Sequence, residues 1–373
     1  MRAGGGQRTL ILGTTPLARR LAELLSSHTG GRYRLLGAVR EPDAAPPRLF
    51  PCPLLGTLDD LGRLLREHRP QRVIVALAER RRRLPVHHLI EARVIHQVSV
   101  ENGDEVYEHF SGKLATDALT PSRVIFSHDF RPSATARAAG RALSLIAALA
   151  GLLLFLPLCL AIAAAIKADS AGPVLFVQER TGLGGRSFRM FKFRTMHPAT
   201  EQHSEWVRDN GDRITRVGRW LRKYRLDELP QFINILRGDM NLVGPRPHPL
   251  SNFGLLALVS RNVPECGEQI PYYYLRSMVR PGVTGWAQVR YRYANDIDEE
   301  MEKLRYDLYY IKHHSIALDL RILLETVKVV VTGREALESQ AAGSTAAADA
   351  DAVADEAPLA QTLKAVNARD LRN

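Results

Sequence analysis

The chain has 373 residues, which is long enough for two domains because single hydrophobic cores usually stop growing at a smaller size. Its formal net charge of +11 suits nucleic acid, anionic lipid or a phosphorylated substrate and does not choose among them. Cys52, Cys159 and Cys266 lie far apart without metal-ligand spacing, which argues against a disulfide scaffold and favours a reducing cytoplasm. The glycine-rich start lacks the apolar core of a signal peptide, so we expect the first domain to begin in the cytoplasm.

Residues 1–130 predict a Rossmann-like α/β domain with a parallel sheet. Strands are expected at 9–12, 33–39 and 72–77, and helices at 17–25 and 58–66. The first turn carries Thr15 where a dinucleotide-binding fingerprint has its second glycine, whose missing side chain lets the pyrophosphate approach the backbone. The sequence therefore favours a domain that serves in packing or regulation over one that binds NAD. It also argues against a dehydrogenase that would use this domain to reduce a nucleotide sugar.

Residues 131–169 contain the most apolar stretch of the chain. From Ala142 to Ile166 no side chain is charged, and about 25 residues at helical rise would cover roughly 37 Å, enough for a bilayer. Cations flank both ends, which favours keeping both ends on the cytoplasmic side. Pro157 lies near the middle and predicts a kink. Together these features favour a re-entrant membrane helix hairpin, with a plain transmembrane helix as the alternative.

Residues 170–332 are basic and rich in aromatic, glycine and proline residues. In the run from Phe191 to Thr195, strand alternation sends Lys192 and Arg194 to one face. This pattern indicates either a phosphate clamp or an ordinary solvated strand face. The segment from Arg213 to Tyr224 predicts an amphipathic helix with a cationic side. It would rest on an anionic membrane surface, aim Arg222 at a phosphate, or be a plain surface helix.

The run Leu226-Asp227-Glu228-Leu229-Pro230-Gln231 has two interpretations. Asp227 is a good helix N-cap and Glu228 complements the helix dipole, so the run is typical of a simple helix start. Alternatively, the nearby arginines keep Asp227 ionised, and it acts as a nucleophile towards phosphorus.

Two further motifs contain rigid turns. Gly244-Pro245-Arg246-Pro247 excludes helix around Arg246, so this arginine is either preorganised or simply exposed on a turn. The segment from Arg280 to Gln288 predicts a glycine-rich loop beside Trp286, which either seats a nucleotide base or precedes a strand.

In this order, the motifs resemble the bacterial sugar transferase family, the polyprenyl-phosphate phosphoglycosyl transferases. The matching motifs are Lys192 to Met196, Leu226 to Gln231, Gly244 to Pro247 and Arg280 to Trp286, and the resemblance covers residues 131–332. The long members resemble undecaprenyl-phosphate glucose or galactose phosphotransferases of exopolysaccharide biosynthesis. These usually carry several transmembrane helices before the α/β domain, whereas this sequence starts directly at that domain.

The resemblance implies transfer of a sugar 1-phosphate from a UDP-sugar, with a hexose favoured, to polyprenyl phosphate. Asp227 would be the nucleophile that carries the phosphosugar, and Glu228 its partner, with Mg²⁺ held by both acids. The expected substrate-binding residues are Lys192, Arg194, Arg222, Arg246, Arg280 and Gln288.

The resemblance also implies an enzyme at the cytoplasmic face of the bacterial inner membrane, and it allows a homodimer. Residues 170–332 would form a mainly helical catalytic domain with amphipathic interfacial helices. The long uncharged stretch argues against a nucleic-acid partner. Residues 333–373, rich in Ala, Asp and Ser with almost no aromatics, are predicted to be mostly disordered.

Overall fold

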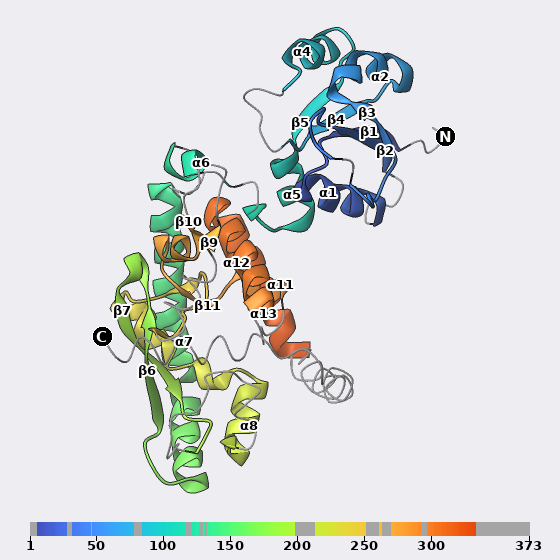
Figure 1. Ribbon diagram of the computed structural model, residues 1–373. Helices are drawn as coiled ribbons and strands as arrows, with labels where there is room; N and C mark the ends of the chain where they lie inside the picture. Colours follow the sequence, from blue (N-terminus) through green and yellow to red (C-terminus); the bar gives the residue numbers. More distant parts are fainter. Residues whose placement is uncertain are drawn as a thin grey trace, which may run out of the picture.

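The structure is a computed structural model in which the chain forms an N-terminal sheet domain and a C-terminal region built along one long helix (Figure 1). The predicted disordered tail and Cys266 lie outside the described residues. The described residues are 6–27, 32–45, 47–77, 84–116, 119, 121–126, 130, 133–197, 213–250, 261–262, 270–291 and 297–332.

The N-terminal domain contains a five-stranded, wholly parallel sheet in the order β3-β2-β1-β4-β5. This is the strand order of a doubly wound Rossmann-like sheet, so the predicted α/β class is confirmed. The sequence patterns missed β3, β5 and the last two helices of the domain. The strands are β1 (Gln7–Leu12), β2 (Tyr33–Arg40), β3 (Leu54–Thr57), β4 (Arg72–Val75) and β5 (Ser99–Asn102). The helices are α1 (Pro16–Ser27), η1 (Leu58–Asp60), α2 (Leu61–His68), α4 (Val86–Val94) and α5 (Gly103–Ser111).

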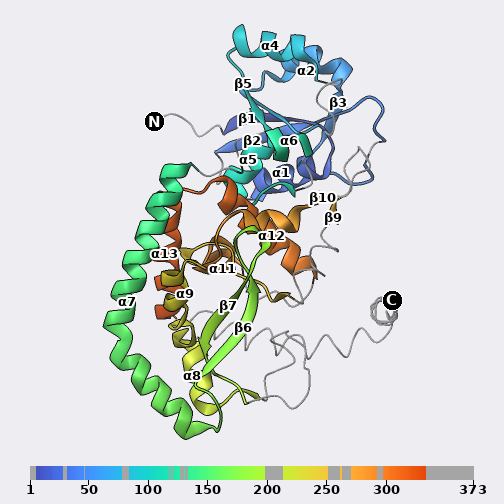
Figure 2. The same ribbon diagram turned by 90° about the vertical axis from the view of Figure 1, so that its left-hand side faces the viewer.

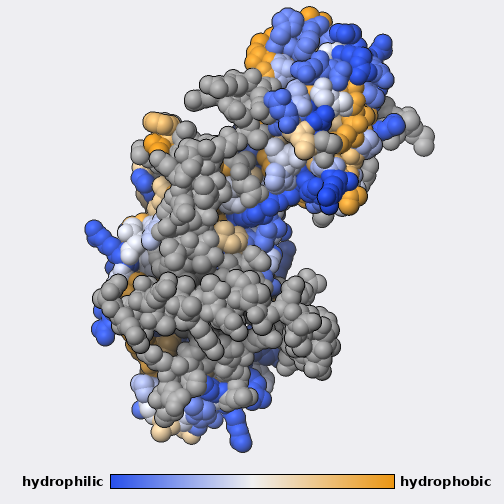
Figure 3. All heavy atoms as spheres, in the orientation of Figure 1, coloured by the Kyte–Doolittle hydropathy of each residue, from blue (hydrophilic) through white to orange (hydrophobic). Residues whose placement is uncertain are grey.

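Alternating strand residues bury apolar side chains on both faces of this sheet. Leu10 and Leu12 point into a core covered by α2 and α4, whereas Ile11 points into a core covered by α1 and α5. Burial on both faces explains why the strands have continuous apolar runs. The outer face of α4 leaves Val86, Ile90, Val94 and Ile95 exposed, and orange spheres mark this end of the domain in Figure 3.

The first turn of the domain is closed by its own side chain. The Thr15 hydroxyl donates to the Ala76 carbonyl at 2.7 Å and accepts from the Ala18 amide at 3.2 Å. Gly13 has φ of +112°, and a Cβ there would lie 2.3 Å from the same Ala76 oxygen. Thr15 therefore occupies the helix start where a fingerprint glycine would leave room for a pyrophosphate.

The long apolar segment forms a single helix, α7 (Ala134–Asp169), which contains Pro157. The predicted re-entrant hairpin is not confirmed. Instead, one helix runs along the side of the C-terminal region and bends in its lower part (Figure 2). A proline removes one backbone donor and crowds the preceding turn, so a bent helix is the expected result. By length and composition α7 is able to cross a membrane, and it leaves Ile146, Leu149 and Leu153 exposed.

The C-terminal region packs small sheets and helices against α7. Its first pair, β6 and β7, is an antiparallel hairpin, whereas β8 and β11 are parallel and come from distant motifs. The strands are β6 (Leu175–Thr181), β7 (Ser187–Phe193), β8 (Asn241–Val243), β9 (Arg261–Asn262), β10 (Ile270–Pro271) and β11 (Gly282–Thr284). The helices are η3 (Leu183–Gly185), α8 (Arg216–Lys223), η5 (Leu226–Glu228), α9 (Gln231–Arg237), η6 (Tyr272–Met278), α11 (Trp286–Arg290), α12 (Ile297–Lys312) and α13 (Ile316–Thr332). Short α6 (Pro121–Phe126) precedes α7.

The N-terminal domain docks onto the C-terminal region through the end of α5. Glu108 accepts hydrogen bonds from Lys312 at 2.7 Å and contacts His313 Nε2 at 3.0 Å. The Trp286 indole donates to the Gly112 carbonyl, the residue that ends α5, at 2.9 Å. The domain is thus connected to the Arg280 to Gln288 motif, which forms β11 and the start of α11 and not the predicted glycine-rich loop.

Candidate active site

Strand β7 and helix α9 are joined side by side through Asn234. Its side-chain oxygen accepts from the Phe191 amide at 3.0 Å, and its amide group donates to the Arg189 carbonyl at 2.7 Å. Asn234 is completely buried. This double connection fixes Lys192, on the strand, beside the two acids that precede α9.

The two acids lie in a tight turn rather than at a regular helix start. Arg225 adopts the left-handed conformation with φ of 52°, and η5 follows it. Pro230 is the N-cap of α9, so the interpretation of Asp227 as a helix N-cap is wrong. A left-handed residue followed by a 3₁₀ turn aims consecutive side chains in different directions. The turn therefore presents both carboxylates to the surrounding cations.

Glu228 lies at the centre of a cluster of charges. Its Oε1 atom lies 2.9 Å from Lys192 Nζ, 3.4 Å from an Arg246 nitrogen and 4.0 Å from an Arg225 nitrogen. Burial opposes the ionised form, but the cations outweigh it and hold the pKa of Glu228 well below its usual range. We call this set, together with Asp227 and Arg222, the site cluster.

Asp227 is the acid of the site cluster that has no direct partner. Among the residues that the structure describes, no side chain forms an ion pair with its carboxylate. Burial and the adjacent Glu228 charge raise the pKa of Asp227, and the nearby cations oppose that shift. A partly buried carboxylate in a cationic field, with its oxygens uncommitted, suits a nucleophile better than a structural acid.

Arg246 is brought to the cluster by two rigid motifs that lie side by side. Strands β8 and β11 pair Asn241 with Gly282 and Val243 with Thr284. A Cβ on Gly244 would lie 2.4 Å from the Arg280 carbonyl oxygen, so only glycine permits this approach. The Gly-Pro-Arg-Pro turn leaves its arginine directed at Glu228.

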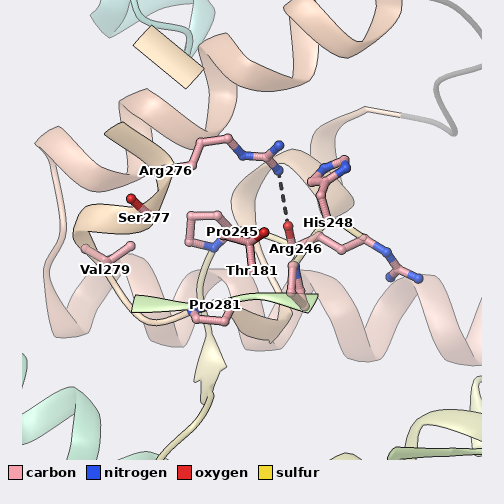
Figure 4. A pocket seen from close by; sticks show the side chains of 10 residues that line it. Thr181, Pro245, Arg246, His248, Arg276, Ser277, Val279 and Pro281 are labelled. Carbon is pink, nitrogen blue, oxygen red and sulfur yellow. Dashed lines mark hydrogen bonds between the residues drawn. The ribbon is translucent and has the colours of Figure 1, made fainter. Parts of the chain in front are cut away.

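A second buried cluster of charges holds the backbone of Arg246. Arg276 donates to the Arg246 carbonyl at 3.3 Å, as the dashed line in Figure 4 shows, and pairs with Asp307 at 2.6 Å. Glu300 lies 3.4 Å from Arg276, 3.1 Å from His248 and 3.6 Å from Lys303. The support cluster, as we call it, consists of Arg276, Asp307, Glu300, His248 and Lys303. They position the turn and do not contact Glu228.

The structure brings Lys192, Arg222 and Arg246 around the acids but places two other predicted residues elsewhere. Arg194 lies just past the end of β7 and donates to the carbonyl and hydroxyl oxygens of Ser170, at the end of α7. The predicted pair of Lys192 and Arg194 on one face is therefore not formed. Arg280 donates to the Gly238 carbonyl at 3.0 Å, at the opposite end of α9 from the acids.

Gln288 lines a cavity of about 190 Å³ that reaches Arg225 and Glu228. The other walls are mostly apolar. They come from α9, β8, β11 and α13, with Leu229, Phe232, Leu242, Val283, Leu323, Val329 and Val330 among them. Both terminal atoms of Gln288 are buried without a hydrogen-bond partner. Gln288 thus belongs to an apolar cavity beside the acids.

The sequence patterns missed several residues that build the site. Arg225 precedes the acidic motif by one residue, so its position near Glu228 was predictable from the sequence. Its left-handed backbone conformation was not predictable. Asn234 and Arg276 lie outside the motifs and carry no signal of their own in a single sequence. Their partners are 43 and 30 residues away in the chain.

The donor set fits a hard divalent cation. Mg²⁺ prefers carboxylate oxygens together with water and phosphate oxygens. Asp227 offers an uncommitted carboxylate, and Glu228 contacts its cations through one oxygen, Oε1. These two adjacent acids are therefore chemically suited to hold Mg²⁺ with a phosphorylated ligand.

Comparison with known proteins matches the same region. The family model described as bacterial sugar transferase matches residues 135–333. A UDP-N-acetylgalactosamine-undecaprenyl-phosphate N-acetylgalactosaminephosphotransferase of Aeromonas hydrophila is 41% identical over 230 residues, which cover 61% of this chain and 51% of that protein. UDP-glucose:undecaprenyl-phosphate glucose-1-phosphate transferases of Caulobacter vibrioides and Escherichia coli are 44% and 40% identical. Those matches cover 52% and 55% of this chain, and 69% and 42% of the relatives. The chain thus spans about half the length of the Aeromonas relative.

Proposed function

The chain belongs to the bacterial sugar transferase family, and we propose that it transfers a sugar 1-phosphate from a UDP-sugar to polyprenyl phosphate, such as undecaprenyl phosphate. A hexose is the favoured sugar, UMP is released, and the product initiates an exopolysaccharide or another glycan. The observation that carries this proposal is the uncommitted Asp227 carboxylate inside a cluster of cations.

The first half-reaction is a displacement at phosphorus. An Asp227 carboxylate oxygen attacks the phosphorus that bears the sugar, and the bond from that phosphorus to the UMP oxygen breaks. UMP leaves with the electron pair, and a phosphosugar aspartate remains. Lys192, Arg222 and Arg246 surround Asp227 and stabilise negative charge on the phosphate oxygens during this displacement.

The second half-reaction returns Asp227 to its free form. An oxygen of polyprenyl phosphate attacks the same phosphorus, and the bond to the Asp227 oxygen breaks. The product is a polyprenyl diphosphate sugar. Because one anionic group is released before the next one reacts, a single cationic site serves two anionic substrates in turn.

Bound Mg²⁺ would supply charge neutralisation for the phosphate oxygens. Asp227 and Glu228 are the residues that would hold it. Lys192 and Arg246 both contact Glu228 through Oε1 and so orient its carboxylate.

Membrane attachment is supported by α7 and by α8. Helix α8 buries Leu221 and exposes Trp220, which stacks on Tyr224 with ring centres 5.7 Å apart. Aromatic rings beside arginines are typical of the interface between headgroups and acyl chains. We place the site at the cytoplasmic face of the inner membrane, where a soluble nucleotide sugar and a lipid phosphate both reach Asp227.

The proposed function is tested by incubating the purified full chain with a series of UDP-sugars and Mg²⁺, and following UMP release with and without undecaprenyl phosphate. One UDP-sugar should give a burst of UMP without lipid and continuous turnover with it. Intact-mass measurement should then detect the added phosphosugar. UMP release that strictly requires lipid, with no added mass, would contradict a covalent intermediate.

The topology of α7 is tested by substituting Pro157. Cysteines at Ser133 and Ala171, in a cysteine-free background, should both resist an impermeant thiol reagent in intact cells if the helix returns to the cytoplasmic side. Pro157→Leu restores a backbone donor and straightens the helix, so residue 171 should become labelled in part of the population, with a matching loss of activity. If labelling and activity do not change, Pro157 does not determine the topology.

A further inference from the structure

The apolar cavity that Gln288 lines leads away from the acids towards the middle of α7. Phe232 forms part of its wall, and Gly151 of α7 lies against the ring of Phe232 so closely that a Cβ there would be 2.6 Å from a ring carbon. Leu149 and Leu153 flank this glycine and are 53% and 66% exposed. The cavity therefore lies between the site cluster and the apolar helix α7.

The walls of the cavity exclude a sugar or a nucleotide as its occupant. A hexose or a uridine needs several hydrogen-bond partners, because buried hydroxyl groups without them are costly. Thr284 and Thr326 bond each other at 2.7 Å, and the Thr326 hydroxyl also bonds the Ile322 carbonyl at 2.8 Å. Apart from these, the lining polar groups are Gln288 and the charged Arg225 and Glu228 at one end. This arrangement matches a hydrocarbon whose polar head is anionic.

We propose that this cavity is the subsite for the first isoprene units of the lipid acceptor, next to its phosphate. The inference rests on the proposed function and names the place where the second substrate binds. The phosphate would lie at the end formed by Arg225 and Glu228, and the branched chain would extend between α9 and α13 towards α7. Gln288, whose amide atoms are buried and unpaired, would contact the polar end of the lipid.

The subsite predicts that the two half-reactions respond differently to the same substitution. Val330→Phe fills the cavity from α13, and Gln288→Leu removes the amide at nearly constant volume. Val330→Phe should keep the lipid-independent UMP burst, because the nucleotide sugar does not use the cavity. Val330→Phe should raise KM for farnesyl phosphate about tenfold or more, since one methylene-sized misfit in an apolar pocket changes binding by about 10-fold to 200-fold. Gln288→Leu should also raise this KM while increasing the Tm of the unliganded protein, because it removes an unpaired buried polar group.

A matched control is available on the same helix. Leu324 lies on α13, is 67% exposed and does not line the cavity. Leu324→Phe should leave both the UMP burst and the KM for farnesyl phosphate unchanged. Loss of the UMP burst in Val330→Phe would assign the cavity to the nucleotide sugar and overturn the proposal. An unchanged KM in both variants would show that the cavity is only a packing defect.

Binding is measured separately so that the lipid subsite is tested without turnover. A farnesyl phosphate that carries a diazirine on its first isoprene unit is photolysed with the full chain in detergent, and labelled peptides are identified by mass spectrometry. Labelling of α13 between Leu323 and Val330, reduced in Val330→Phe and retained in Leu324→Phe, supports the subsite even if no UDP-sugar is turned over. Turnover without labelling of α13 or α9 would leave the proposed function standing and overturn the subsite.

Discussion

The site cluster and the support cluster are both charged and meet at Arg246, yet their burial and their charge balance differ. The site cluster has two acids, Asp227 and Glu228, and four cations, Lys192, Arg222, Arg225 and Arg246. The support cluster has two acids, Glu300 and Asp307, and two cations, Arg276 and Lys303. Burial lowers the pKa of its fifth member, His248, to about 4, so this imidazole is neutral at pH 7.

The difference in charge balance indicates which of the two clusters needs a bound ligand to neutralise its charge. Buried charges are stable when paired, as in the support cluster, whereas two excess positive charges around the buried Glu228 are costly. Burial lowers the pKa of Lys192, and Arg246 adds to that shift against the attraction of Glu228. The fold thus holds cations together that only an anionic ligand balances, as a diphosphate would.

The sharpest way to test the comparison is to remove the uncommitted acid. Asp227→Asn keeps the size of the side chain but removes the nucleophilic oxygen, so the UMP burst and turnover should fall by at least about 10³-fold. The Tm should change little, because Asp227 forms no ion pair with any described residue. Turnover within tenfold of the parent protein would exclude Asp227 as the nucleophile.

Neutralising the other acid of the site cluster should affect activity and stability together. Glu228→Gln leaves the three cations that contact Glu228 without this carboxylate. The site cluster then has four cations and one acid, an excess of three positive charges in place of two. We expect turnover to fall about 10²-fold and stability by about 2 kcal/mol, because a buried cation loses its partner. Both are measured against Glu325→Gln, a surface acid paired with Arg290 and Arg321. A variant with normal rates at every Mg²⁺ concentration would exclude a role for Glu228.

The local parts of both regions were predictable from sequence, and the parts made by distant contacts were not. The runs around β1, β2 and β4 are apolar and bounded by turns, so these strands were found, whereas β3 and β5 are short and partly polar. Lys192, Arg222 and Arg246 belong to motifs with a recognisable chemical pattern. Arg276 and Glu300 acquire a role only through the fold.

Arg194 shows why strand alternation alone misled the interpretation. Lys192 and Arg194 are two residues apart, which places both on one face only while the strand continues. Strand β7 ends at Phe193, and Arg194 turns to the end of α7 instead. The sequence does not show where the end of α7 lies in space relative to β7, so the contact between Arg194 and Ser170 was not predictable.

A substitution in the support cluster should reduce stability more than catalysis. Glu300→Gln removes an acid that contacts three partners, so the free energy of unfolding should fall by about 3 kcal/mol. Turnover should fall about tenfold, because the carbonyl of Arg246 is held by Arg276. The loss should appear in KM for the UDP-sugar, with the UMP burst retained at saturating substrate. A normal Tm would contradict the supporting role of this cluster.

The smallest expected effect is a change in the pH dependence of stability. His248 takes up a proton below about pH 4 in the folded protein and below its ordinary pKa of 6.5 when unfolded. The unfolded state therefore binds more protons between these values, and stability conferred by His248 is lost as the pH falls from 6.5 towards 4. Burial raises the pKa of Asp307 to about 6, which acts in the opposite direction, because its folded form keeps a proton that the unfolded form has released.

Between pH 6.5 and 4.5 these two effects partly cancel in the parent protein. His248→Gln removes the first and leaves the second, so the variant should gain stability relative to the parent protein as the pH falls, by about 2 kcal/mol over this range. Glu300, with a pKa held at about 2, contributes a loss only below its ordinary value of 4.5 and does not disturb this range. The measurement is urea unfolding in detergent at half-unit pH intervals. Parallel curves for the two proteins would mean that folding leaves the pKa of His248 unchanged, and this would contradict the burial of a neutral imidazole in the support cluster.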